Sequence, residues 1–72
     1  MELTIENYKE GYAVGIKVNE GLGYILQTYF RICGKVKEFE SRPDAAFILE
    51  KIHSGEIGFD LSEKQYQQLT QF

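Results

Sequence analysis

Residues 36–61, VKEFESRPDAAFILEKIHSGEIGFDL, decide the fold that we expect of this 72-residue chain. Their middle predicts a capped amphipathic helix that begins at Ser41, because apolar residues follow at the spacing i, i+3, i+4 and i+7. Those apolar residues are Ala45, Ile48, Leu49 and Ile52. Gly55 ends the helix, and residues 57–61 then alternate apolar with polar side chains, as a half-buried strand does. The order of elements predicts an α+β fold.

Four further strands are expected upstream, over residues 3–7, 12–18, 24–32 and 35–40. Glycine-rich turns separate them, and the run 24–32 carries the strongest β signal because it is long and aromatic. In that run Phe30 faces the core and Tyr29 faces the opposite side. Val36 and Phe39 are three residues apart, so both can face the core only if the fourth strand contains a bulge. We therefore expect an antiparallel sheet of four to five strands with the helix packed on one face.

A short C-terminal helix is predicted after Ser62, which forms a capping-box pattern with Gln65. Tyr66 and Leu69 would share one side of this helix, with Phe72 close to it. Helices of this length are marginal in water, so contacts with the rest of the protein must hold it in place.

The chain length predicts a single small domain that spans residues 1–72. A domain of this size buries only about 60% of the surface that its unfolded chain exposes, so its stability margin is thin. Cys33 is the only cysteine and His53 the only histidine, which excludes an internal disulfide and a four-ligand zinc site. Tight packing or self-association remains as the source of stability, and we expect a homodimer.

Charge and hydropathy indicate a cytoplasmic protein without a membrane span. The first residues are acidic and alternating, unlike a signal peptide, and no apolar run approaches the length needed to cross a bilayer. A lone thiol is typical of a reducing compartment. Eleven acidic residues against eight basic ones give a net charge of −3, which argues mildly against nonspecific binding of nucleic acids.

The motifs of common enzymes are missing from the sequence. Gly21 and Gly23 lack the third glycine and the following helix of a dinucleotide site, and no phosphate-binding lysine or nucleophilic serine motif is present. His53 fits the C-terminal end of the helix, where its charge would interact with the helix dipole. Cys33 lies beside a turn glycine with no partner for catalysis. We expect no enzyme activity, no cofactor and no metal; an enzyme would need a site assembled across a subunit boundary.

Aromatic residues outside the expected core predict binding to another protein or to a second copy of the chain. Phe47 falls almost opposite the apolar stripe of its helix, and Ile25 and Tyr29 lie on the second face of the sheet. Tyr66 and Phe72 complete the candidate partner-binding set. Two interpretations of Phe47 stay open: the terminal helix covers it, or it anchors an interface.

The favoured hypothesis is a non-enzymatic protein-binding module, a small phage-type or bacterial inhibitor or regulator that occupies the surface of a partner protein. The alternative is nucleic-acid binding by the basic hairpin 31–42, because Arg31, Lys35, Lys37 and Arg42 are interleaved with Phe30 and Phe39. Glu38 and Glu40 share that segment and Phe30 is better explained as a core residue, so solvated strand residues are the favoured account of these bases.

Overall fold

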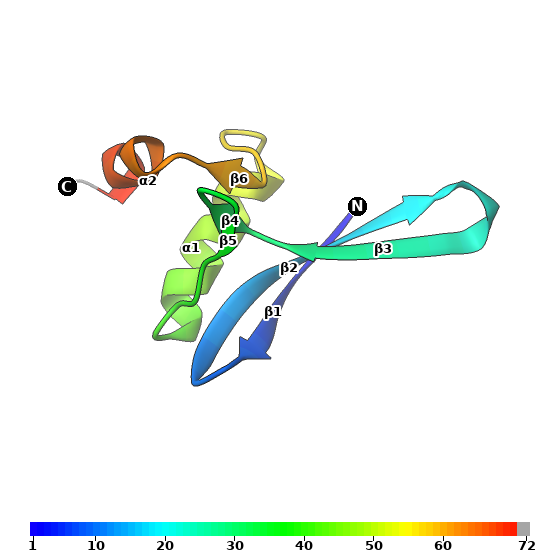
Figure 1. The fold of residues 1–72 in the computed structure, drawn as a ribbon, viewed down its shortest axis with the longest axis horizontal. Coiled ribbons are helices and arrows are strands. Elements are labelled where there is room, and N and C mark those ends of the chain that lie inside the picture. Colours follow the sequence, from blue (N-terminus) through cyan, green and yellow to red (C-terminus); the bar gives the residue numbers. More distant parts are fainter. Residues whose placement is uncertain (71–72) are drawn as a thin grey trace.

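A computed structural model describes residues 1–70 of the chain, without the side chains at positions 20, 22 and 24–26. The fold is α+β, as expected, with an elongated outline of 43 × 26 × 21 Å (Figure 1). None of the helices in this described part is long and apolar enough to cross a membrane.

The first sheet contains three antiparallel strands in the order β1 (Glu2–Tyr8), β2 (Gly11–Glu20) and β3 (Tyr24–Tyr29). Leu3 pairs with Ile16 and Ile5 pairs with Val14, so these four side chains share one face of the sheet. That face is the core face, because Val14 and Ile16 are fully buried.

A second three-stranded sheet replaces the single antiparallel sheet of four to five strands that the sequence predicts. It has the order β5 (Lys35–Val36), β4 (Arg31–Ile32) and β6 (Asp60–Leu61), and β6 runs parallel to β4. The predicted strand 24–32 is split at Phe30, and the predicted strand 57–61 is reduced to two residues. The split occurs at Phe30 because its N–H still donates to Val14 in β2, whereas its carbonyl accepts from Lys37 and the next N–H, that of Arg31, donates to Phe59.

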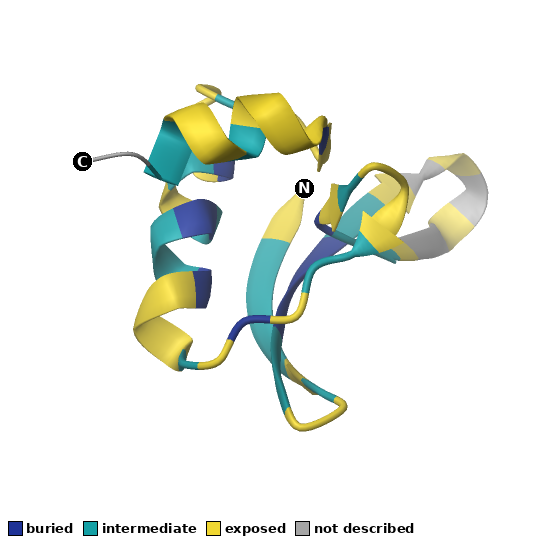
Figure 2. Cartoon of the chain, turned by 60° about the vertical axis from the view of Figure 1, so that its left-hand side comes forward, coloured by how far each residue is buried: buried dark blue, intermediate teal, exposed yellow. Residues whose placement is uncertain are grey.

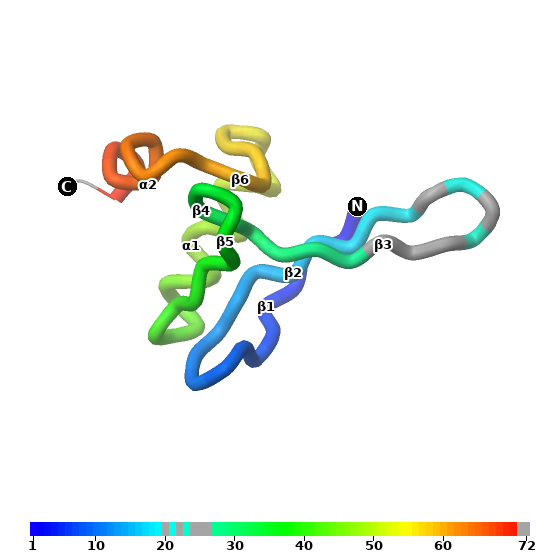
Figure 3. The backbone as a smooth tube through the Cα atoms, viewed as in Figure 1, coloured from blue at the N-terminus to red at the C-terminus, as the bar shows by residue number. Residues whose placement is uncertain are grey.

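Phe39 resolves the three-residue spacing from Val36 without a bulge. β5 ends at Val36, and Phe39 then exchanges two backbone hydrogen bonds with Tyr12 of β2, at 2.9 and 2.7 Å. Phe39 thus continues the edge of β2 that β3 leaves at Phe30. The segment between β5 and α1 runs from the second sheet past β2 to the start of the helix (Figure 3). The two apolar residues belong to different sheets, so the assumption of one strand over residues 35–40 was wrong.

Helix α1 (Arg42–His53) forms as the sequence predicts, with Ser41 as its N-cap. The Ser41 Oγ accepts a hydrogen bond from the Asp44 backbone N–H at 3.4 Å, which satisfies one of the free donors at the helix start. Gly55 follows with φ of +82°, the left-handed conformation that ends many helices. The predicted stripe is buried except at Leu49, which is half-buried on the flank of the helix.

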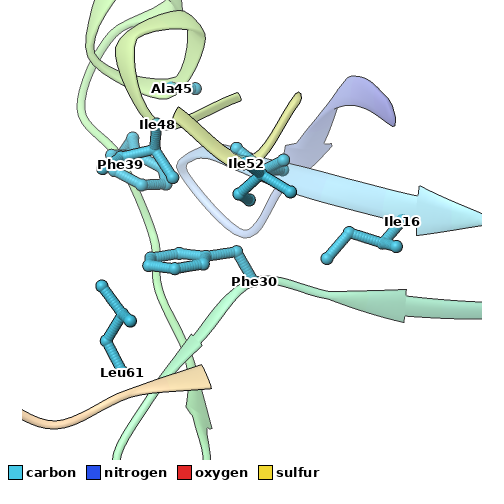
Figure 4. Packing of buried hydrophobic residues seen from close by; sticks show 8 residues of the cluster. Ile16, Phe30, Phe39, Ala45, Ile48, Ile52 and Leu61 are labelled. Carbon is cyan, nitrogen blue, oxygen red and sulfur yellow. The ribbon is translucent and has the colours of Figure 1, made fainter. Parts of the chain in front are cut away.

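The core lies between α1, the first sheet and the second sheet, with Phe30 near its centre (Figure 4). The Phe30 side chain is fully buried, and its ring centroid lies 6.4 Å from that of Phe39 and 6.5 Å from that of Tyr66. The cluster of buried apolar residues consists of Val14, Ile16, Phe30, Phe39, Ala45, Ile48, Ile52 and Leu61.

Helix α2 (Glu63–Thr70) covers one end of this core with half-buried residues (Figure 2). Its capping box is confirmed. The Gln65 backbone N–H donates to the Ser62 Oγ at 3.1 Å, and the Ser62 backbone N–H donates to the Gln65 Oε1 at 2.9 Å. Tyr66 and Leu69 pack against the core, as expected, whereas Phe72 lies outside the described residues.

Gly11→Ala is expected to lower the free energy of unfolding by roughly 1–3 kcal/mol, the usual range for steric overpacking. A β-carbon at Gly11 would collide with the backbone oxygen of Phe39 and approach the Glu38 Cγ to 3.1 Å. Gly58→Ala is the matched control, because a β-carbon there meets open space. Urea denaturation of both variants checks the prediction, and equal stability would mean that Phe39 does not pack against β2 as described.

Candidate functional site

The first sheet has one face that the core does not use, which we call the open sheet face. Its described residues alternate with those that point toward α1: Glu2, Thr4, Glu6 and Tyr8 from β1, Gly11, Ala13, Gly15, Lys17 and Asn19 from β2, and Gln27 and Tyr29 from β3. None of these residues belongs to the hydrophobic cluster or packs against it within the described part of the chain. Both α1 and the second sheet therefore lie on the opposite side.

Small residues in β2 shape the centre of the open sheet face. Thr4 and Tyr29 flank Gly15 in the neighbouring strands, and Ala13 is fully buried beneath the longer side chains around it. A β-carbon at Gly15 would collide with the Glu6 Oε2 and lie 2.8 Å from the Thr4 Oγ1. Glycine at this position lets the carboxylate of Glu6 reach across β2.

Polar and aromatic contacts cross the open sheet face above these small residues. The Gln27 Nε2 donates a hydrogen bond to the Glu6 Oε2 at 2.7 Å. The rings of Tyr8 and Tyr29 meet with their centroids 5.8 Å apart and tilted by 49°, and the Lys9 Nζ lies 5.5 Å from the centroid of Tyr8. The result is a half-buried tyrosine pair beside a charged hydrogen-bond acceptor.

Sequence reasoning identified Tyr29 on this face but missed Tyr8. The expected first strand stopped at Asn7, which left Tyr8 in a turn, whereas β1 continues through Tyr8. The alternation of Glu2, Thr4, Glu6 and Tyr8 was the signal that could have found it. The side chain of Ile25, another predicted partner-binding residue, lies outside the described residues, as does Phe72.

Phe47 and Tyr66 lie away from the open sheet face, at the junction of α1 and α2. Both are half-buried against the core, and together with Asp44, Ile48 and Thr70 they line a hollow of about 330 Å³. The Lys51 Nζ lies 5.4 Å from the centroid of the Phe47 ring. The arrangement is the one that the covering interpretation of Phe47 expects, with α2 beside the ring.

The structure does not gather the four predicted nucleic-acid-binding bases on one surface. Arg31 pairs with Val36 and Ile32 with Lys35, so Arg31 and Lys35 lie on opposite faces of the β4–β5 hairpin. The two remaining bases lie over aromatic rings: the Lys37 Nζ is 5.5 Å from the centroid of Tyr66, and the Arg42 guanidinium is 5.2 Å from that of Tyr12.

An acidic groove of about 570 Å³ adjoins these bases at the start of α1. The residues that line it are Glu10, Gly11, Lys37, Glu38, Phe39, Glu40, Asp44 and Tyr66. Its carboxylates repel phosphate, which weakens the nucleic-acid alternative further. They do not form a metal site, because no three His, Cys, Asp or Glu residues within the described residues lie close enough to hold an ion.

Cys33 and His53, whose residue types often act as nucleophile or general base in enzymes, are both exposed. Cys33 has φ of +52° and precedes Gly34 with φ of +77°, the pattern of a type I′ turn at the tip of the β4–β5 hairpin. His53 lies in the last turn of α1. In the described part of the chain, neither side chain forms a hydrogen bond or an ion pair.

Comparison with protein-family models, curated proteins and solved structures gives no match.

Alkaline pH is expected to destabilise the fold through Tyr66. Partial burial raises the pKa of Tyr66 above its usual value of 10.0, and the nearby negative charge of Asp44 raises it further. The folded state therefore holds this phenolic proton more tightly than the unfolded chain does. The resulting stabilisation is present below pH 10 and is lost as the pH rises through the raised pKa. Urea midpoints measured across this range should fall more for the wild type than for Tyr66→Phe, and parallel curves would contradict the prediction.

Proposed function

We propose that this chain is a non-enzymatic protein-binding module that docks on a partner protein through the open sheet face. The observation that carries the proposal is the one-sided use of the first sheet. α1 and the core occupy one face, while the other presents the Tyr8–Tyr29 pair with no described element packed over it. An aromatic pair surrounded by polar groups is typical of the centre of a protein interface.

The shape of this face suits a protein surface better than a small ligand. Ala13 and Gly15 leave no deep cavity at its centre, because the side chains of neighbouring strands close over them. A hollow of about 470 Å³ lies at one end of the face and is lined by Met1, Glu2, Lys17, Asn19 and Gly23. Small-molecule sites are usually concave, whereas protein interfaces are broad and contain a few anchoring residues. A matching partner surface would place an apolar side chain against the two rings and a hydrogen-bond donor near Glu6.

Such a module would regulate by occupancy. An inhibitor or regulator of this kind acts by blocking a surface of its partner, so it needs no catalytic nucleophile or base. This proposal includes the phage-type or bacterial inhibitor expected from the sequence. Nucleic-acid binding has less support, because the four bases are dispersed and the acidic groove lies among them.

Replacement of both tyrosines, Tyr8→Ser with Tyr29→Ser, is expected to weaken partner binding strongly while leaving the fold intact. Quantitative affinity capture from a bacterial lysate compares the wild type with this variant and with Phe59→Ser, a control whose side chain is 39% exposed outside this face. The strongest hit that depends on the tyrosines is then purified and titrated. Loss of two anchors should raise its Kd by roughly 30-fold or more, with circular dichroism as the test of folding.

Equal capture by all three proteins would contradict the role of this face. Repetition of the titration at higher salt separates the two functional classes. A protein interface of this composition changes little, whereas binding to phosphates weakens steeply with ionic strength.

A further inference from the structure

We propose that two copies of this chain pair through the outer edges of their β1 strands. The strands run antiparallel, with a two-fold axis that passes beside Ile5 and stands perpendicular to the sheet. The first sheet of one copy and the first sheet of the other then form one continuous sheet of about six strands. This inference stands on the backbone of β1 and goes beyond the proposed function of the open sheet face.

The hydrogen bonds that β2 makes on the side away from β1 show which N–H and C=O groups of β1 point outward. Tyr12 exchanges both of its backbone hydrogen bonds with Phe39, and the Val14 carbonyl accepts from the Phe30 N–H, so these groups of β2 point away from β1. Tyr12 is opposite Asn7 and Val14 is opposite Ile5. In antiparallel pairs, opposed residues are either both bonded or both unbonded to each other. Asn7 and Ile5 therefore direct their N–H and C=O groups outward.

The same alternation turns the groups of Leu3 outward and those of Thr4 and Glu6 toward β2. Because β1 is the first strand of the sheet order, nothing in that order pairs with its outer side. Within the described residues, the outward groups of Leu3, Ile5 and Asn7 have no protein partner. The edge is a row of donors and acceptors available to another strand.

The β1 edge carries two charged residues, Glu2 and Glu6, but lacks most of the other features that prevent such pairing. Its register with β2 runs without interruption from Glu2 to Tyr8, so no bulge twists it away. The segment contains no proline and no lysine, which are the residues that most often protect an edge strand. A strand of this length and regularity is suited to β-sheet extension.

The number of hydrogen bonds and the charges together select one register among those that the outward groups allow. With the axis at Ile5, Leu3 pairs with Asn7 of the second copy, and three residue pairs exchange about six hydrogen bonds. Each Glu6 then faces a threonine and each Glu2 faces a tyrosine. An axis at Thr4 would oppose Glu2 to Glu6, and an axis at Glu6 would oppose two glutamates, which is destabilising. The Ile5 register forms the most hydrogen bonds and avoids like charges.

The surface area of the chain leaves room for such an interface. Its accessible surface is 5170 Å², about 600 Å² more than the roughly 4,600 Å² typical of a monomer of 8.3 kDa. Standard protein interfaces bury about 800 Å² from each partner. The excess is of the size that a modest dimer interface removes.

The flank of α1 adds apolar contact to the paired edges. Ala46 and Leu49 lie on the flank opposite Phe47, and Phe47 faces α2 across their shared hollow. α2 lies on the Phe39 side of β2, so Leu49 lies on the β1 side. Because α1 contacts β1 and β2, the axis would place the two α1 helices on the same face of the joined sheet, one on each side of the axis. Leu49, half-buried in one copy, would face its counterpart.

Sedimentation equilibrium of the wild type and of two variants at Asn7 tests the edge. The wild type should approach twice its mass of 8.3 kDa as its concentration rises toward about 1 mM. Asn7→Pro removes an outward N–H from an exposed edge position, where proline is tolerated, and should raise the Kd of the dimer roughly tenfold or more. Asn7→Ala keeps the N–H and should leave the Kd unchanged.

A wild type that stays monomeric, or an Asn7→Pro variant that dimerises as the wild type does, would overturn the proposal. If Asn7→Pro does not fold, a chain with an N-methyl group on Ile5 replaces it, because this methyl blocks the outward donor and keeps the side chain. Ligation at the junction of Ile32 and Cys33 gives access to that chain. It should fold and remain monomeric; dimerisation would again overturn the proposal.

The register has its own test in Glu2→Lys, with Glu63→Lys in α2 as the control that changes the net charge equally. In the Ile5 register the two variants should have the same dimer Kd, because Glu2 faces a tyrosine. A dimer that Glu2→Lys tightens well beyond the control would instead place the axis at Thr4, where the new lysine meets Glu6. That result would overturn the proposed register.

Discussion

The rest of the structure depends on Phe30, the residue at which one sheet ends and the other begins. Its backbone N–H donates to Val14 in β2, and its carbonyl accepts from Lys37 at the base of the β4–β5 hairpin. Its fully buried ring lies against Phe39 and Tyr66, which come from later parts of the chain. The chain leaves β2 at Phe30 and returns to it at Phe39, and the contact between their rings holds these two points together. Both sheets therefore share one core.

Because of that constraint, the packing elements lie on only one face of the first sheet. The second sheet, α1 and α2 all gather on the core face around Phe30, and no described residue of these elements covers the open sheet face or the outer edge of β1. A domain of this size buries only about 60% of the surface that its unfolded chain exposes, and the described helices both contribute to the core on one face of the first sheet. The proposed partner-binding face and the proposed dimer edge are two consequences of the same shortage of covering elements.

Local chemistry predicted much of this fold and long-range packing decided the remainder. The N-cap at Ser41, the glycine after α1 and the capping box of α2 involve neighbours in sequence, and all three are present. The split at Phe30 and the bridge of Phe39 to Tyr12 join distant segments, so alternation alone could not show them. In the candidate site, Tyr29 was predicted from its face, whereas Tyr8 depended on the end of β1, the least reliable feature of a strand.

Residue-resolved amide hydrogen exchange at several protein concentrations tests most directly the claim that the β1 edge is where the chain is incomplete. In dilute solution the N–H groups of Leu3, Ile5 and Asn7 should exchange rapidly, while those of Thr4 and Glu6 are protected by β2. The first group should gain protection as the concentration rises and the second should change little. Protection of Leu3, Ile5 and Asn7 that is already high in dilute solution, or that stays low at every concentration, would contradict the account.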